Sequence, residues 1–417
     1  MPTSKKGTIE KTLCRDLVTR VQNVTNITYM KSKLIVDVVL SELADRVIST
    51  RKIMDEILDQ RKSNPSSNDI SLSDDAVALR QRFEELAPFQ NHLEQRTSVF
   101  DEDDLLVRGR LDDLLDLLKT ADSEMCWRVL EENGYTPVHT LVLYYQMETR
   151  VQLRLVTLQI FDALCHLNAK VVSELNNSVL PVELARGMTR QTAGSPTFMR
   201  SCLILTTIFS TGEPLPAIHY EHFNEEFLKF LFRLVEEPPD HPTVDELRDR
   251  VIPVILAFNL HLSEPDKNPV MNVLGKEMRV NRFLEELMML VNREADPVRI
   301  LTHKRHPRNS LMKFLSDMYS RKDTAKLFYT NDEKVLVGIL LRHIQDCTPE
   351  HCSRREYLSV FYLMLKHSRY LDHCHHQKDF QEIFTSICLE EDHGEDTLRD
   401  KLIVKQIWKE FPHLFSV

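Results

Sequence analysis

Positions that break or cap helices recur at nearly constant spacing through most of this chain. They fall near Asp101, Thr149, Ser195, Thr243, Pro307 and Ser353. The starts that they mark are separated by 48, 46, 48, 64 and 46 residues, and each block holds two or three stretches with an apolar face at helical spacing. Armadillo and HEAT repeats are helical units of roughly 40–47 residues. The spacing therefore predicts an all-α fold, an armadillo- or HEAT-like α-solenoid, over residues 101–417.

The scarcity of glycine supports this interpretation. Only 9 of the 417 residues are glycine, about 2% against a usual share near 7%. Tight β-turns and phosphate-binding loops need glycine wherever φ is positive. The run Cys202–Phe209, which is apolar on both sides, is accordingly interpreted as a buried central helix rather than a strand.

Residues 1–100 are predicted to form an N-terminal helical extension. Helical periodicity covers residues 8–26, and a second pattern runs without proline or glycine through residues 28–61. The second pattern fits one long helix, and a two-helix hairpin broken near Ser49 and Thr50 is the alternative.

A polar, turn-rich stretch follows this pattern. Residues 62–72 are predicted to form a flexible loop that projects into solvent. Ser73-Asp74-Asp75 is a capping signature, and the helix that it starts is expected to run towards Gln95.

The longest interval and the end of the chain carry two further predictions. The 64-residue interval is expected to contain an extra helix, Lys276–Asn292, and a projecting loop, Arg293–Pro307. A terminal helix, Leu398–Phe411, is expected to cap the array. Its inward residues are predicted to be Leu402, Ile403, Ile407 and Trp408, with Lys401, Lys405 and Lys409 on the outer face.

Charge and cysteine usage exclude several classes of function. The formal net charge is −10, which argues against nucleic-acid binding because phosphate contacts need a cationic surface. The 8 cysteines have no framework spacing, and no apolar leader follows the polar start, so reduced thiols in the cytoplasm are expected. No apolar stretch approaches the ~20 residues that span a bilayer, and no transmembrane segment is predicted.

Catalytic motifs are missing from the sequence. It contains no G-x-G-x-x-G, no G-x-x-x-x-G-K-[ST], no G-x-S-x-G and no H-E-x-x-H. Carboxylate pairs such as Glu285/Glu286 adjoin apolar residues at helical spacing and are interpreted as solvated helix faces. We therefore expect a protein without enzymatic activity and without a cofactor.

One group of thiols and imidazoles contains the side chains that bind zinc. It comprises Cys347, His351, Cys352, His373, Cys374, His375 and His376. The spacing is irregular and contains no C-x-x-C, and adjacent His375 and His376 would point to different faces of a helix. No metal site is predicted.

The densest cationic run lies in the expected projecting loop. Its positive residues are Arg299, Lys304, Arg305 and Arg308, in an otherwise acidic chain. A solvated loop between repeats is one interpretation. The other is a partner-binding patch for an acidic surface, which such a run would steer by charge.

Short strings along nearly the whole chain resemble one family. They include Leu13–Val18, Tyr144–Glu148, Ser178–Arg186, Phe209–Pro216, His219–His222, Leu260–Leu262, Leu290–Arg293, Asp296–Ile300, Leu327–Asp332, Tyr357-Leu358, Tyr370-Leu371 and Asp379–Gln381. The chain is similar at these strings to the C-terminal armadillo-repeat region of the Nck-interacting SH3-domain (WISH/DIP) family.

This resemblance implies a regulator that binds and activates the Arp 2/3 complex without a preformed filament and so produces linear seed filaments. The implied partners are the Arp 2/3 complex and, indirectly through it, actin. The sequence leaves open whether the chain also forms a homodimer. The implied location is the cytoplasmic actin cytoskeleton, at the cell cortex, the leading edge or endocytic sites. The sequence has no SH3 domain and no proline-rich linker, so it is either an isolated C-terminal region or a short member like the fungal ones.

A generic armadillo-repeat adaptor that tethers signalling or cytoskeletal partners is the alternative function. The long N-terminal helical extension bears on this choice, because a minimal peptide-binding array would not need it.

Overall fold

A computed structural model describes most of the chain as helices. It describes residues 13–25, 27, 29–46, 74–94, 101–239, 244–276, 279–301, 308–348, 352–391 and 394–415. These residues contain no strand, and the predicted all-α, solenoid-like fold is confirmed. The chain divides into two compact units, Met1–Ser178 (unit 1) and Val179–Val417 (unit 2).

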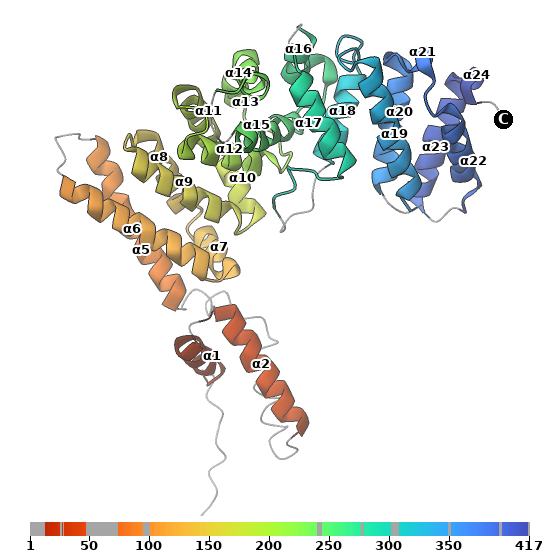
Figure 1. The fold of residues 1–417 in the computed structure, drawn as a ribbon. Helices are drawn as coiled ribbons and strands as arrows, with labels where there is room; N and C mark the ends of the chain where they lie inside the picture. Colours follow the sequence, from red (N-terminus) through yellow and green to blue (C-terminus); the bar gives the residue numbers. More distant parts are fainter. Residues whose placement is uncertain are drawn as a thin grey trace, which may run out of the picture. The chain divides into compact units, whose positions relative to one another are not determined.

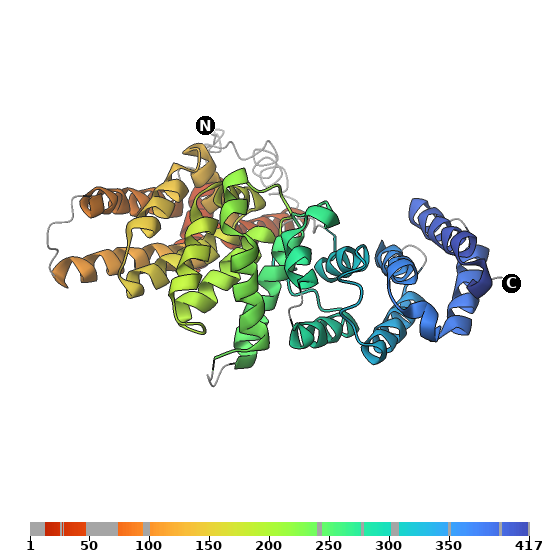
Figure 2. The ribbon, with the colours of Figure 1, turned by 90° about the horizontal axis from the view of Figure 1, so that it is seen from above.

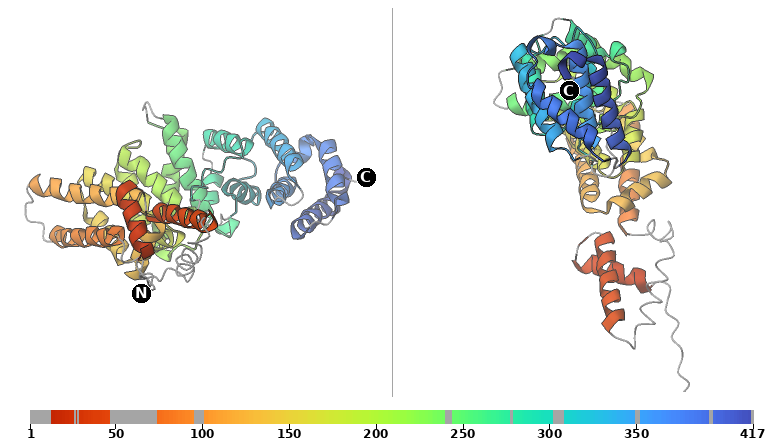
Figure 3. Two further views of the ribbon diagram at one scale, coloured as in Figure 1. Left: turned by 90° about the horizontal axis from the view of Figure 1, so that it is seen from below. Right: turned by 90° about the vertical axis from the view of Figure 1, so that its right-hand side faces the viewer.

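Unit 1 is built from helices that pack on near neighbours in the sequence. They are α1 (Leu13–Thr25), α2 (Tyr29–Arg46), α5 (Asp74–Glu94), α6 (Asp101–Thr120), α7 (Ser123–Glu132), α8 (Thr136–Met147), α9 (Val151–Cys165) and α10 (Ala169–Asn177). α1 lies beside α2, as both views of Figure 3 show. α5 packs against α6, α7 and α8, and α6 packs against α9 (Figure 1).

Parts of the predicted extension lie outside the described residues. They include residues 47–61, where one long helix and a hairpin were the alternatives, and the expected loop at 62–72. The helix predicted from Ser73 towards Gln95 is confirmed as α5. The expected division at residue 100 stays a prediction, although α5 shares contacts with α6 and α8 across it.

Unit 2 stacks its helices in chain order. The first half contains α11 (Leu180–Arg190), α12 (Pro196–Phe209), α13 (Ala217–His222), α14 (Glu225–Glu236), α15 (Val244–Asn259), the 3-10 helix η1 (Pro265–Lys267), α16 (Pro269–Gly275) and α17 (Asn281–Asn292). The second half contains α18 (Ser310–Tyr319), α19 (Thr330–Asp346), α20 (Cys352–His367), α21 (Tyr370–His373), α22 (Gln377–Leu389), α23 (Glu395–Glu410) and α24 (Pro412–Phe415). Figure 1 and Figure 2 show this progression from green to blue.

The predicted block starts coincide with the starts of six described helices. They begin α6, α9, α12, α15, α18 and α20 to within three residues. In unit 2, α12 packs on α15, α15 on α18, α18 on α20 and α20 on α23. These helices supply the buried centre of the stack; Cys202, Leu205 and Phe209 of α12 are each 0% exposed, as predicted.

Short polar side chains explain why the helices begin where they do. Ser195 accepts a hydrogen bond from the backbone N–H of Phe198 at the start of α12. Asn309 does the same for Leu311 and Met312 at the start of α18. Each cap satisfies backbone donors that have no partner within the helix, so these starts are encoded locally.

After α15, the long interval contains two further α-helices, α16 and α17, where one was expected. The expected helix Lys276–Asn292 is shorter than predicted and begins at Asn281, as α17, and it is preceded by α16. Asn268 caps α16, so a helix begins here before the predicted start at Lys276.

The predicted inward face of the terminal helix is partly wrong. Ile407 is buried, but Leu402 is 65% exposed, and Ile403 and Trp408 are only partly buried. The buried face instead consists of Thr397, Asp400, Val404 and Ile407. Asp400 is buried because it pairs with Arg354 at 2.7 Å, and this pairing turns Leu402 to the opposite side of the helix.

The outer face of α23 was predicted more accurately. Lys405 and Lys409 are exposed, whereas Lys401 is partly buried and donates a hydrogen bond to the carbonyl oxygen of Glu390 at 2.5 Å. The short helix α24 follows α23 and packs against it. Among the described helices, none is both long enough and apolar enough to cross a membrane.

Candidate partner-binding surfaces

The structure describes two of the four cations predicted to bind a partner. Arg299 and Arg308 are the two ends of the cationic run, and we call residues 293–308 of unit 2 the basic segment. Lys304 and Arg305 lie outside the described residues.

The first part of the basic segment is held against the body of unit 2. After α17 the chain turns through Glu294, whose φ is 52°. Asp296 then accepts hydrogen bonds from the backbone N–H and the hydroxyl of Ser310, at 2.9 and 2.6 Å. Val298 and Leu301 are buried. This stretch therefore lies against the start of α18 and does not project, whereas residues 302–307 lie outside the described residues.

Each of the two described cations has a carboxylate nearby. Nε of Arg299 lies 3.7 Å from Oδ2 of Asp296, and Nε of Arg308 lies 3.7 Å from Oε1 of Glu356. Nη2 of Arg308 also donates a 2.9 Å hydrogen bond to Oγ of Ser316. Both arginines remain more than two-fifths exposed. Exposed ion pairs contribute at most about 1 kcal/mol, so an acidic partner could compete for both guanidinium groups.

A buried polar cluster joins the helices next to this segment. Oδ2 of Asp317 accepts hydrogen bonds from Nδ2 of Asn259 at 2.9 Å and from Nδ2 of Asn268 at 3.2 Å. Nζ of Lys313 donates to the same carboxylate and, at 2.7 Å, to the carbonyl oxygen of Leu262. Burial raises the pKa of Asp317, and the Lys313 ammonium offsets only part of that rise. The cluster ties α15, α16 and α18 together.

The thiols and imidazoles of the zinc-type group lie at the ends of different helices. Cys347 follows the C-terminal end of α19, His373 ends α21, and residues 374–376 form the turn between α21 and α22. Nε2 of His373 lies 3.8 Å from Oε1 of the buried Glu333. His351 lies outside the described residues. In the part of the chain that the structure describes, no three His, Cys, Asp or Glu side chains are arranged to hold a metal ion.

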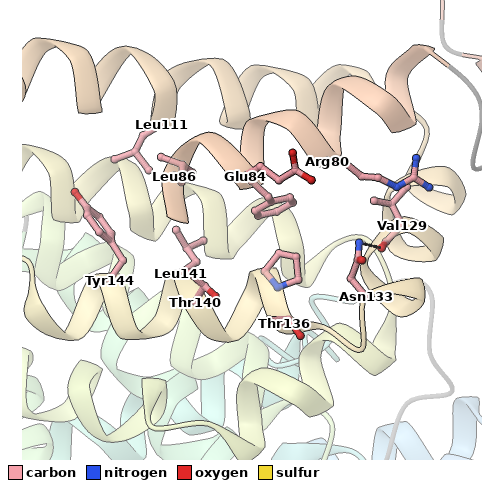
Figure 4. A pocket seen from close by; sticks show the side chains of 12 residues that line it. Arg80, Glu84, Leu86, Leu111, Val129, Asn133, Thr136, Thr140, Leu141 and Tyr144 are labelled. Carbon is pink, nitrogen blue, oxygen red and sulfur yellow. Dashed lines mark hydrogen bonds between the residues drawn. The ribbon is translucent and has the colours of Figure 1, made fainter. Parts of the chain in front are cut away.

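Unit 1 contains a groove of about 360 Å³ between α5 and α8 (Figure 4). Its floor is apolar, with Phe83 and Leu86 from α5, Leu111 from α6, and Leu141 and Tyr144 from α8. All five are 8% exposed or less. In Figure 4 the four labelled members of this set gather at one end of the groove. The groove is thus an opening into the apolar core of unit 1.

Short side chains on α8 leave this groove unfilled. The first turns of α8 present Thr136, Pro137 and Thr140 to it. α8 begins here because Gly134 and Tyr135 both have a φ of 57° and reverse the chain, and because Pro137 suits the first turn of a helix. The same local signals that start α8 therefore place small residues opposite α5.

Within the described part of the chain, the rim of the groove carries one negative charge without a counter-ion. Nη2 of Arg80 donates a 2.8 Å hydrogen bond to Oε2 of Glu132, so the charge of Arg80 is balanced. Glu84 is exposed and has no hydrogen-bond or ion-pair partner among the described residues. The rim therefore favours a cation beside an apolar floor.

Sequence reasoning did not find this groove. Its floor residues belong to the ordinary apolar pattern of helices, which indicates burial but not whether a neighbour fills the space. The small side chains of Thr136, Pro137 and Thr140 were the one sequence feature that bears on the groove. They indicate an unfilled space only when α5 is known to lie opposite them.

A comparison with protein-family models identifies a domain in unit 2. Residues 244–380 match the model for the SPIN90/Ldb17, leucine-rich domain. The match begins with α15 and reaches into α22, so it includes the basic segment and the Asp317 cluster but not the groove of unit 1. This domain family is of a non-catalytic, adaptor type. Residues 244–380 therefore belong to the SPIN90/Ldb17 leucine-rich domain family, which confirms the resemblance over this part of the chain.

Proposed function

We propose that this chain is a non-enzymatic regulator of actin assembly that binds and activates the Arp 2/3 complex without a preformed filament. The filaments that it starts are linear and act as seeds. The observation that carries the proposal is the SPIN90/Ldb17 leucine-rich domain at residues 244–380, which supports a SPIN90-type cytoskeletal or endocytic protein. Activation of the Arp 2/3 complex is inferred from the resemblance to the Nck-interacting SH3-domain family.

A helical stack is suited to this kind of activation. Stacked repeats expose an extended surface that can hold a partner in one conformation. A binding protein activates its partner only if it binds the active conformation more tightly than the inactive one. A shift from 1:99 to 99:1 needs about 5.5 kcal/mol of differential affinity. The ATP chemistry would remain with the partner.

The basic segment of unit 2 is our candidate for part of the interface. Arg299, Lys304, Arg305 and Arg308 concentrate positive charge in a chain of net charge −10. Such a patch would raise the rate of encounter with an acidic surface and would lose that effect in salt. The described part of the segment is already held by Asp296, so little conformational entropy would be lost on binding.

An actin-assembly assay tests the proposed activity. The purified chain is mixed with Arp 2/3 complex, ATP and pyrene-labelled actin, without preformed filaments. We expect faster assembly than with Arp 2/3 complex alone, and unbranched filaments by fluorescence microscopy. Binding of the complex without acceleration would instead support the tethering adaptor.

Charge reversal tests the proposed interface. Lys304→Glu with Arg305→Glu should weaken binding to the Arp 2/3 complex about tenfold, and the loss should shrink in added salt. Lys322→Glu with Lys326→Glu is the matched control, because both lysines are exposed in the same unit but lie outside the segment. Equal effects of the two double variants would assign the interface to another surface.

The proposed partners and location follow from the same inference. Actin would be engaged indirectly through the Arp 2/3 complex, at the cell cortex, the leading edge or endocytic sites. Sedimentation equilibrium of the purified chain would test whether it forms a homodimer.

A further inference from the structure

The groove between α5 and α8 has the dimensions of a short helical contact. Its lining on α8 recurs at one-turn intervals, at Thr136, Thr140 and Tyr144. On α5 it recurs at Arg80 and Glu84. Residues 136–144 span about 12 Å of helix at 1.5 Å per residue. A helix lying in a groove of this length would present side chains at positions i, i+3 or i+4, and i+7.

The depth of the groove calls for large apolar side chains. Phe83, Leu86, Leu111, Leu141 and Tyr144 form its floor (Figure 4). The phenol of Tyr144 already donates a 2.8 Å hydrogen bond to Glu148, so the side of Tyr144 available to a ligand is its ring. An apolar side chain entering here would remove exposed apolar surface on both partners.

The groove is open to solvent along its rim. Glu84, Asn133 and Thr136 are all exposed. An enclosed small ligand would be surrounded on most sides, whereas this opening leaves room for the backbone of a partner helix above the floor.

Charge selects the kind of helix. Glu84 lies at the rim without a partner among the described residues, while the charge of Arg80 is balanced by Glu132. On the neighbouring helix α6, Asp112 and Asp113 already pair with Arg108 and Arg82, so Glu84 is the charge at the rim that a partner would meet. A helix with lysine or arginine beside its apolar stripe would meet complementary charge, whereas an acidic helix would be repelled.

We propose that this groove binds a basic amphipathic helix of a partner protein. Apolar side chains of the helix enter between α5 and α8, and a lysine or arginine one turn away pairs with Glu84. The site lies in unit 1, outside residues 244–380. It is therefore a second docking surface, independent of the proposed Arp 2/3 interface in unit 2.

Peptide selection on the full chain tests the proposal. The probe is a display library of helical peptides of about 16 residues, roughly four turns, with counter-selection on Thr140→Trp. The indole of that variant would fill the groove from its rim. Enriched peptides are expected to carry apolar residues at i, i+3 or i+4, and i+7 together with a net positive charge. Enrichment of acidic sequences, or of sequences without this stripe, would overturn the proposal.

Affinity measurements on one enriched peptide then locate the contact. By fluorescence anisotropy, Thr140→Trp should weaken binding by about tenfold or more, and Glu84→Lys by about threefold to tenfold. Asp116→Lys is the matched control, because Asp116 is an exposed acid of α6 that does not line the groove. Its effect should stay within about twofold.

Other occupants give distinguishable results, and each contradicts the helix proposal. Recovery of no groove-dependent peptide, together with Thr140-dependent binding of an apolar dye, would assign the groove to a small ligand. Self-association that Thr140→Trp abolishes would assign it to a second copy of the chain. An unchanged circular-dichroism melt of each variant shows that it is folded. Thr140→Trp should not change the rate in the actin-assembly assay with Arp 2/3 complex. A failure of the helix-binding proposal can therefore be told apart from a failure of the proposed Arp 2/3 activation.

Discussion

The two units satisfy their buried carboxylates in different ways. In unit 1, Glu148 is 1% exposed, and its partners are close in sequence: the Tyr144 hydroxyl at 2.8 Å and the Arg150 guanidinium at 2.6 Å. In unit 2, Asp400 is equally buried, but its partner Arg354 lies 46 residues away, at 2.7 Å. The first contact fixes a corner between α8 and α9, whereas the second joins α20 to α23.

The surroundings move the two pKa values in opposite directions. Burial alone would raise the pKa of Glu148, but hydrogen bonds from Arg150 and Tyr144 outweigh it, so the pKa is lowered. Burial raises the pKa of Asp400 despite its pairing with Arg354, as it does for Asp317. The donors close to Glu148 in sequence thus stabilise its ionised form, whereas the pairing of Asp400 with Arg354 on a distant helix only partly offsets desolvation.

The largest effect is expected from breaking the contact between α20 and α23. Arg354→Met removes the cation that faces Asp400 and, at 2.8 Å, Glu390. It should lower the free energy of unfolding by about 3–5 kcal/mol, because a buried carboxylate is left without its partner. Urea unfolding followed by circular dichroism measures the change.

The neighbouring arginine provides the matched control. Arg355 pairs with Asp396 at 2.9 Å, but both side chains are about one-third exposed. Arg355→Met should therefore cost at most about 1 kcal/mol. Equal losses of unfolding free energy for the two variants would show that burying the Arg354 ion pair does not make it more important for stability than the exposed Arg355 pair.

The next effect concerns the Asp317 cluster. Asp317→Asn should cost about 2–4 kcal/mol, because Lys313, Asn259 and Asn268 lose their shared anionic acceptor. The folded-state pKa of Asp317 is raised. The folded protein therefore retains a proton that the unfolded chain releases, and wild-type stability falls as pH rises towards the raised pKa. The cost of the variant should shrink over that range, measured by thermal unfolding.

Glu148→Gln in unit 1 should give a smaller cost with the opposite dependence on pH. We expect about 1.5–3 kcal/mol at neutral pH from the loss of charge-assisted hydrogen bonds. The folded-state pKa of Glu148 is lowered, so its contribution is complete above the unfolded pKa and disappears as pH falls through the folded pKa. A cost that grows on acidification would contradict the proposed network.

The smallest effect tests the register of α23. Leu402→Gln should change stability by less than about 0.5 kcal/mol, because Leu402 is exposed on the side of the helix away from Asp400. Ile407→Ala on the buried face should cost about 2–5 kcal/mol. The urea midpoints of the two variants compare these costs. A larger loss of stability from Leu402→Gln than from Ile407→Ala would mean that Leu402 is buried, as the sequence had predicted.

The apolar pattern and the caps were sufficient to predict the helix starts at the block boundaries. The starts of α6 at Asp101 and α12 after Ser195 follow from residues within one helical turn of each start. The shift of α17 to Asn281 and the exposure of Leu402 were not predicted, because both depend on contacts with residues far away in the sequence. Of the basic segment, sequence analysis found the cations but not the anchoring of its first part by Asp296 at Ser310.

The sequence by itself determined the all-helical composition and the repeat spacing, because helix propensity, capping and apolar periodicity act over a few residues. Only the tertiary structure decided which face of α23 is buried, since Asp400 is an inward residue only when Arg354 lies opposite. It also decided that the space between α5 and α8 stays open. Burial, ion pairing and unfilled volume depend on which helices become neighbours, and no short stretch of sequence contains that information.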